Sequence, residues 1–244
     1  MACRREESGR GKAQGGRGKA QGSRGSGGRG KAQGSRGSGG RGSGGRGPAA
    51  YPGLPAGYDL YETLDMASDR AVFKRISWCS LIIVAVMIAL GRLTVSPSAL
   101  FSIGWLRVLL AACLTIVGMV VYVFAHEWVH GVFIRIFTGE PAKFGFKAGS
   151  GMAYAKSSWF FSRPAYIAVA LAPVLVWGVV LGVLMGDVPA EYFWCLYAIQ
   201  IFNVSGAVGD IYVTWLVLRM PQGVLIYDEG VSMKFFAPVR FEEG

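Results

Sequence analysis

Apolar stretches long enough to cross a bilayer are the feature of this sequence that most restricts its fold. A transmembrane helix needs roughly 20 predominantly apolar residues, because the hydrocarbon core of a membrane is about 30 Å thick. Hydrophobic residues make up 52% of the chain and charged residues only 16%, against about 25% charge in ordinary soluble domains. We expect membrane-spanning helices at about 76–93, 105–137, 165–186 and 190–218. The sequence therefore predicts an all-α polytopic membrane protein with four transmembrane helices.

Short alternating segments predict a small β-hairpin between the second and third of these helices. Polar and apolar residues alternate over 143–147 and again over 152–156, on either side of a turn that contains Gly149 and Gly151. The same reasoning allows a second hairpin within residues 224–236, after the last apolar stretch.

The N-terminal segment differs in composition from the rest of the chain. Residues 1–47 contain twelve Lys or Arg and two Glu, so they account for the whole net charge of +10. The segment repeats Arg and Gly and has no hydrophobic residue larger than alanine between Cys3 and Pro48, so we expect residues 1–50 to be a disordered tail. A basic arm for anionic lipid or nucleic acid is one interpretation, and a solvated tail is the simpler one. No aromatic side chain is interleaved to stack on bases, so nucleic acid is not expected as a partner.

Two further segments complete the predicted organisation. Residues 51–75 alternate between apolar and polar side chains and are expected to form an ordered pre-membrane segment that could include a short strand. Residues 76–240 are expected to form the transmembrane domain.

The distribution of basic residues predicts the orientation in the membrane. The loop after the second apolar stretch contains Arg135, Lys143, Lys147, Lys156 and Arg163. The connection between the third and fourth stretches has Asp187 and Glu191 and no basic residue. Loops rich in Lys and Arg stay on the cytoplasmic side. We therefore expect a multi-pass protein of the cell membrane with both termini in the cytoplasm.

The only two histidines of the chain form the motif His126-Glu127-Trp128-Val129-His130. Residues four apart lie on one face of a helix, so both imidazoles can reach one metal ion. The glutamate between them is placed to act as a general base toward a water molecule on that metal. This pattern of residues predicts a hydrolytic zinc site within the second apolar stretch.

A hydrolytic zinc site takes three protein ligands, and without a third histidine the third must be a carboxylate. The acidic candidates are Glu140, Asp210, Asp228 and Glu229. His130 lies five residues before Arg135 and Asp210 nine before Arg219, which puts them roughly 7 and 13 Å from the same side of the membrane at about 1.5 Å per residue. An unpaired carboxylate at such depth is costly, so the depth favours Asp210 as the ligand. The alternative is that Asp210 pairs with a neighbouring tyrosine or backbone group.

Asn203 precedes the candidate ligand on the same expected helix face. Asn203, Gly206 and Asp210 follow one stripe, and the glycine would allow a close approach to the helix of the histidines. The Asn203 amide could bind the substrate backbone or a developing oxyanion, which makes Asn203 a candidate substrate-binding residue. A polar contact between helices is an equally good interpretation of Asn203.

The chain resembles the site-2 protease group of intramembrane zinc metalloproteases, and more closely short prokaryotic membrane proteins described as zincin peptidases. The resemblance covers about residues 55–240 and rests on the two-histidine motif, the hairpin, a third core helix, and Asn203 and Asp210 in the last helix. The family has prolines between that asparagine and aspartate and a glycine after the aspartate, whereas here no proline intervenes and Ile211 follows. The resemblance implies that Asp210 is a zinc ligand. It also implies that transmembrane substrates are cleaved near the membrane surface, beside a strand that holds them unwound.

We therefore expect an intramembrane zinc metalloprotease, a zinc metalloendopeptidase that hydrolyses membrane proteins with a zinc-activated water. Zn²⁺ would be held by His126, His130 and Asp210, and Glu127 would be the catalytic base. The expected partners are a membrane protein substrate and the lipid bilayer. Three alternatives stay open: a non-catalytic scaffold with a structural metal site, a membrane metallohydrolase of a non-protein substrate, and a four-helix membrane protein in which the motif is accidental.

Overall fold

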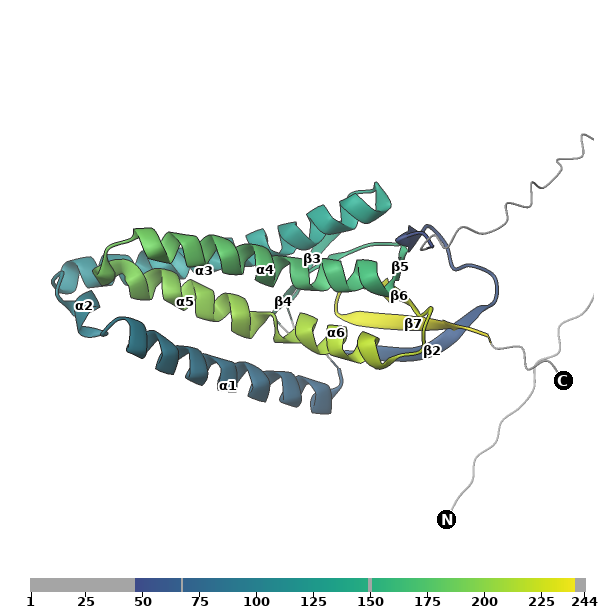
Figure 1. Ribbon diagram of the computed structural model, residues 1–244, viewed down its shortest axis with the longest axis horizontal. Coiled ribbons are helices and arrows are strands. Elements are labelled where there is room, and N and C mark those ends of the chain that lie inside the picture. The colour runs from purple at the N-terminus through teal and green to yellow at the C-terminus, as the bar shows by residue number, and fades with distance from the viewer. Residues whose placement is uncertain (1–46, 67, 149–150, 240–244) are drawn as a thin grey trace, which may run out of the picture. The chain divides into compact units, whose positions relative to one another are not determined.

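Long apolar helices dominate the structure, a computed structural model that describes residues 47–66, 68–148 and 151–239. The helices are α1 (Arg70–Thr94), α2 (Ser98–Phe101), α3 (Trp105–Thr138), α4 (Arg163–Asp187), α5 (Ala190–Gly206) and α6 (Val208–Arg219). α1, α3, α4 and the segment formed by α5 and α6 are long and apolar enough to cross a membrane (Figure 1). The four long apolar helices predicted from the sequence are therefore confirmed. The predicted disordered tail, apart from residues 47–50, lies outside the described residues.

Many large apolar side chains on these helices face outward. Leu114 on α3 is 62% exposed and Leu175 on α4 is 63% exposed. Soluble proteins rarely expose extended apolar surfaces of this kind, whereas lipid tails are their natural neighbours. A helix also satisfies its backbone groups internally, which is what a segment surrounded by hydrocarbon requires.

The fourth apolar stretch is not one continuous helix, which corrects the sequence-based expectation. It is interrupted at Ala207, where α5 ends and α6 begins. Sharp helix bends are often found at adjacent Ser and Gly residues, and here Ser205 and Gly206 immediately precede the interruption. As a result, Asp210 lies in the first turn of α6, where the helix dipole favours a negative charge.

Arg163 ties the start of α4 to the end of α6. Its guanidinium donates hydrogen bonds to the backbone carbonyls of Met220 and Pro221, just past the last turn of α6. A cation at this end complements the helix dipole and satisfies carbonyls that the helix itself leaves free. This contact holds α6, and therefore Asp210, in place relative to α4.

The strand content is larger than the single small hairpin expected from the sequence. A five-stranded antiparallel sheet has the order β1-β5-β6-β7-β2. Its strands are β1 (Ala50–Tyr51), β2 (Tyr58–Asp65), β5 (Phe160–Ser162), β6 (Leu225–Asp228) and β7 (Ser232–Pro238). β2 precedes the first long helix and β7 follows the last one, so a pairing such as Leu64 with Met233 is invisible to local alternation. The second hairpin that the sequence allowed is present as β6 and β7, inside this sheet.

The expected hairpin between the second and third long helices is also present. β3 (Lys143–Lys147) pairs antiparallel with β4 (Met152–Lys156) in a separate two-stranded sheet. The ring of Tyr154 in β4 packs between Gly145 of β3 and Gly230 in the turn before β7, and a Cβ atom at either glycine would overlap that ring. Gly230 also has a φ of 99°, which side-chain-bearing residues rarely adopt. The two glycines therefore set the position of β4 against the β6–β7 turn.

The buried core lies where the five-stranded sheet meets the helices. Phe161, Ile226 and Phe235 of the sheet pack in one cluster with residues such as Val169 of α4 and Val213 of α6. Figure 1 shows this sheet at the end of the helices where α4 begins and α6 ends. The sheet thus anchors the helix ends next to the candidate site.

Candidate metal centre

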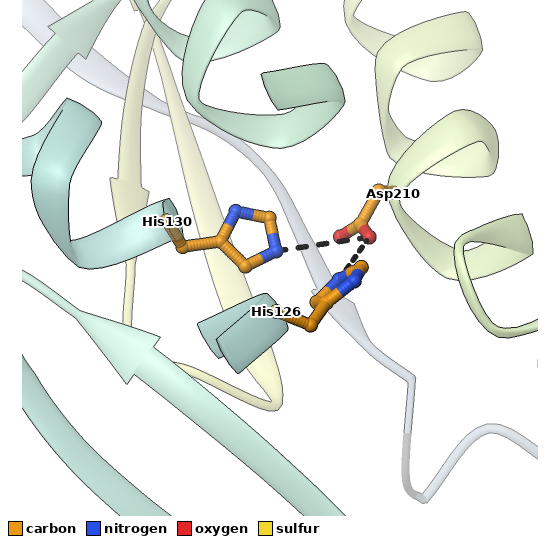
Figure 2. A group of neighbouring side chains, drawn as sticks. All are labelled: His126, His130 and Asp210. Carbon is orange, nitrogen blue, oxygen red and sulfur yellow. Dashed lines mark ion pairs between the residues drawn. The ribbon is translucent and has the colours of Figure 1, made fainter. Parts of the chain in front are cut away.

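Three side chains from two helices converge on one point (Figure 2). His126 and His130 lie one turn apart on α3, and Asp210 projects toward them from α6. The Asp210 Oδ2 atom is 3.5 Å from His126 Nε2 and 3.8 Å from His130 Nε2. All three ligand atoms lie within 4.8 Å of one another, and within the part of the chain that the structure describes no other such group of His, Cys, Asp or Glu occurs. The three residues predicted to bind the metal are therefore brought together.

None of the other acidic candidates belongs to this three-residue group. Asp228 accepts hydrogen bonds from the Gly230 backbone N–H and from the Tyr166 hydroxyl. Glu229 forms an ion pair of 3.0 Å with Lys234, and Glu140 is exposed beyond the end of α3. Within the described residues, neither a tyrosine nor a backbone group donates to the Asp210 carboxylate, which was the alternative to a ligand role.

The geometry and chemistry of this group fit a zinc ion. Tetrahedral zinc with ligand distances of about 2.0–2.2 Å separates its ligand atoms by roughly 3.4 Å, close to the two distances from Asp210. His130 Nδ1 donates to the Val169 carbonyl at 2.9 Å, and His126 Nδ1 is 2.8 Å from the Tyr122 hydroxyl. The outer nitrogen of each ring is thus occupied by a protein partner, which leaves both Nε2 atoms directed at Asp210. Such outer contacts are the usual way in which proteins orient metal-binding histidines.

Glu127 lines the same cavity as the three candidate ligands, and one of its carboxylate oxygens has no hydrogen-bond partner among the described residues. Its carboxylate interacts electrostatically with both histidines and with Asp210, and with the backbone amide of Ala155 in β4. The other oxygen, Oε2, is buried and makes no hydrogen bond to any described residue. A buried carboxylate oxygen without a partner is costly, which is typical of a group whose partner arrives with a ligand. The arrangement places a carboxylate in the same cavity as the three candidate ligands, which is where the motif predicts a base.

A cavity of about 290 Å³ surrounds these groups. Its walls come from α1, α3, α4, α5 and α6, from residues 152–155 of β4, and from the β6–β7 turn. Both Asp228 and Gly230 of that turn line it. A peptide-sized group could therefore reach the metal ligands and the edge of β4 together.

Asn203 does not face the open cavity. It has no exposed surface, and its amide is hydrogen-bonded to Tyr122, Val174 and Gln200. The helix break at Ala207 also separates Asn203 from Asp210, so the expected single stripe does not exist. A direct role in substrate binding stays a prediction, and it would require the amide to exchange its present partners.

Two residues near the candidate metal centre were not predicted from the sequence. Tyr122 precedes His126 by one helical turn, so the i, i+4 rule that groups the histidines also places its hydroxyl beside them. Tyr166 holds Asp228 from the start of α4, and no local pattern connects these two residues because they meet only through the sheet.

Asp228 gives the cavity a group that titrates near neutral pH. Burial raises the pKa of Asp228 from 3.8 to about 7; hydrogen bonds from Gly230 and Tyr166 oppose the rise, and the nearby Asp210 and Glu127 carboxylates add to it. A raised pKa means that the folded state prefers the protonated acid. Its contribution to stability is complete below pH of about 4 and is lost as the pH rises through about 7.

Asp228→Asn should remove this pH dependence. The asparagine amide can still accept from the Gly230 N–H through its oxygen and donate to the Tyr166 oxygen. Between about pH 5 and pH 8, wild type should lose about 1–3 kcal/mol of unfolding free energy relative to the variant. Thermal unfolding of the chelator-treated protein in detergent measures this difference. A stability difference between the two proteins that stays constant over this range would contradict the prediction.

Comparison with known proteins bears on the same segment. Residues 119–225 match the model of a protein family described as "Putative zincin peptidase". The match runs from within α3 to the start of β6 and includes His126, Glu127, His130 and Asp210. The predicted resemblance to zincin peptidases is confirmed over these residues, and it supports a zinc metallopeptidase. No curated protein and no solved structure matches the chain.

Proposed function

We propose that this zincin-peptidase-like chain is an intramembrane zinc metalloprotease that hydrolyses peptide bonds of membrane proteins. The observation that carries the proposal is the meeting of His126, His130 and Asp210 on two membrane-length helical segments, with Glu127 in the same cavity. A structural metal site would give no role to a base beside its ligands. A cavity that places a carboxylate base beside a group of metal ligands is what metal-assisted hydrolysis requires.

The proposed mechanism divides the chemistry among four side chains. The Nε2 atoms of the two histidines and an Asp210 oxygen would hold the zinc ion. When bound, the ion supplies Lewis-acid chemistry, which polarises the scissile carbonyl and makes a water molecule more acidic. Glu127, whose Oε2 has no hydrogen-bond partner among the described residues, accepts the proton of the attacking water and returns it to the leaving amide nitrogen.

β4 is the element best placed to hold the substrate. It pairs with β3 along one edge, and among the described strands none pairs with its other edge. Residues 152–155 of β4 line the cavity, and the Ala155 amide reaches Glu127. An extended peptide can add to such an edge through backbone hydrogen bonds. This step would unwind a transmembrane substrate, because a peptide bond inside a helix is shielded from attack.

The site is proposed to open toward the cytoplasm. Basic residues lie in the last turns of α3 and α6: Arg135 comes five residues after His130, and Arg219 comes nine residues after Asp210. The positive-inside rule places this end in the cytoplasm, together with both termini. Cleavage would then occur a short distance inside the cytoplasmic membrane surface.

The test is proteolysis in a defined membrane. The full chain, loaded with zinc in liposomes, is mixed with single-span membrane proteins that carry Gly or Pro near their cytoplasmic boundary, and matched substrates lacking these helix-breaking residues serve as the control. We expect cleavage near that boundary, faster for the helix-breaking set, stopped by a chelator and restored by zinc. Bound zinc without cleavage of any peptide bond would overturn the proposal. Hydrolysis of lipid esters in the same liposomes would instead indicate a non-protein substrate.

A further inference from the structure

A buried chain of hydrogen bonds connects three helices to one of the candidate metal ligands. Asn203 on α5 donates from Nδ2 to the Val174 carbonyl on α4 at 3.3 Å. The Tyr122 hydroxyl on α3 lies 2.6 Å from Asn203 Oδ1 and 2.8 Å from His126 Nδ1. Asn203 is fully buried and Tyr122 is only 7% exposed, so both side chains are largely shielded from bulk water. This set of contacts is called the Tyr122 relay below.

The direction of every hydrogen bond in the Tyr122 relay follows from the Val174 carbonyl at its end. A backbone carbonyl can only accept, so the amide nitrogen of Asn203 must face Val174 and its oxygen must face Tyr122. That oxygen also only accepts, so it takes the single phenolic proton of Tyr122. The phenolic oxygen must then accept from His126, which places the imidazole proton on Nδ1 and the free lone pair on Nε2.

We infer that Asn203 and Tyr122 are positioning residues that hold His126 in the tautomer and orientation needed to bind a cation through Nε2. This inference rests on the metal site of the proposed function. His130 receives the same restraint from a backbone group, the Val169 carbonyl. The two imidazoles are thus oriented independently, one by the backbone of α4 and the other by side chains of α3 and α5.

Because of the direction of these hydrogen bonds, loss of the Asn203 side chain should weaken zinc binding more than loss of the Tyr122 hydroxyl. This holds although Asn203 is farther from the candidate metal ligands. Without Asn203, the phenolic proton has lost its acceptor and can turn toward His126 Nδ1. That hydrogen bond favours the tautomer with the proton on Nε2, and a protonated Nε2 cannot bind a metal ion. Without the Tyr122 hydroxyl, His126 merely loses a restraint. Outer-shell substitutions of this type typically weaken metal affinity by about 10- to 100-fold.

Zinc affinity in a double-mutant cycle tests the direction of the relay. Competition with a chelator measures the affinity of the full chain in nanodiscs for Zn²⁺. We expect a loss of about 10-fold for Tyr122→Phe and up to about 100-fold for Asn203→Leu. The double variant should match Tyr122→Phe alone, because the misdirected proton is then absent. Tyr197→Phe is the control, since its hydroxyl donates to the Met87 carbonyl outside the site and its loss should leave the affinity unchanged.

A spectroscopic test covers the case in which Asn203→Leu perturbs folding. The chain has two histidines, so zinc-loaded protein labelled with ¹⁵N-histidine should give one ring N–H signal from each. In Tyr122→Phe, the His126 signal should lose its protection from solvent exchange, while the His130 signal, bonded to Val169, should not move.

Two results would overturn the inference. One is an Asn203→Leu loss of zinc affinity that is equally large with and without Tyr122→Phe. The other is a pair of ring N–H signals that both move, or both stay, in Tyr122→Phe. A wild-type chain that binds no zinc would remove the metal site and the proposed function as well. Zinc binding and cleavage that persist unchanged in all these variants would refute the Tyr122 relay alone.

Discussion

Glutamine in place of Glu127 should leave about one zinc ion bound per chain and slow peptide-bond cleavage by about 10²- to 10⁴-fold. Glutamine has nearly the same shape as glutamate but cannot take up a proton at neutral pH. The ligand group of His126, His130 and Asp210 does not include Glu127, so its geometry should survive. Zinc content of the purified variant and the cleavage rate in liposomes are the two measurements.

The matched control for this experiment is Glu140→Gln. This substitution removes the same charge at an exposed position, two residues beyond the end of α3. Its cleavage rate and zinc content should equal those of wild type. If Glu127→Gln cleaves substrate at the wild-type rate, Glu127 is not the base. If it loses zinc, Glu127 belongs to the ligand set instead.

Removal of the Asp210 carboxylate should abolish both zinc binding and cleavage. In Asp210→Ala only the two imidazoles of α3 remain, and a hydrolytic zinc site needs three protein ligands. We expect the zinc affinity to fall by more than about 100-fold, which exceeds the effect of outer-shell changes. Competition with a chelator measures this loss in the full chain.

Asp228→Asn is the stringent control for the ligand assignment. Asp228 lines the same cavity as Asp210, yet its carboxylate is engaged by Tyr166 and Gly230 and stands outside the three-residue group. This variant should therefore bind zinc with wild-type affinity. Zinc that stays bound at full affinity in Asp210→Ala, or is lost in Asp228→Asn, would show that another carboxylate completes the site.

The long helices could be predicted from the sequence because the rule behind them is local. In hydrocarbon each backbone group must be paired within its own segment, so a run of about 20 apolar residues specifies a helix by itself. The pairing of His126 with His130 is local in the same sense, since it depends only on the helical repeat. Tyr122 obeys this rule too and could have been found with it.

The five-stranded sheet could not be predicted with the same rules. β2 and β7 are separated by every long helix of the described chain, and their pairing depends on where those helices end. Alternation within 58–65 or 232–238 indicates a strand but names no partner. The position of Asp228 could not be predicted for the same reason, because the pairing of β6 with β7 places the turn between them at the cavity.

The sequence by itself determined that this chain has membrane-length helices and that one of them carries a two-histidine motif, and it predicted an acid as the third ligand. These conclusions depend on neighbours along the chain. Tertiary structure alone decided that Asp210 stands 3.5 Å and 3.8 Å from the two imidazoles while Asp228 turns to Tyr166. It also decided that the Tyr122 hydroxyl lies within hydrogen-bond distance of both Asn203 and His126. The physical reason is that hydrogen bonds and metal ligation are short-ranged and directional, so they depend on how α3, α4, α5 and α6 pack and where the last apolar segment bends.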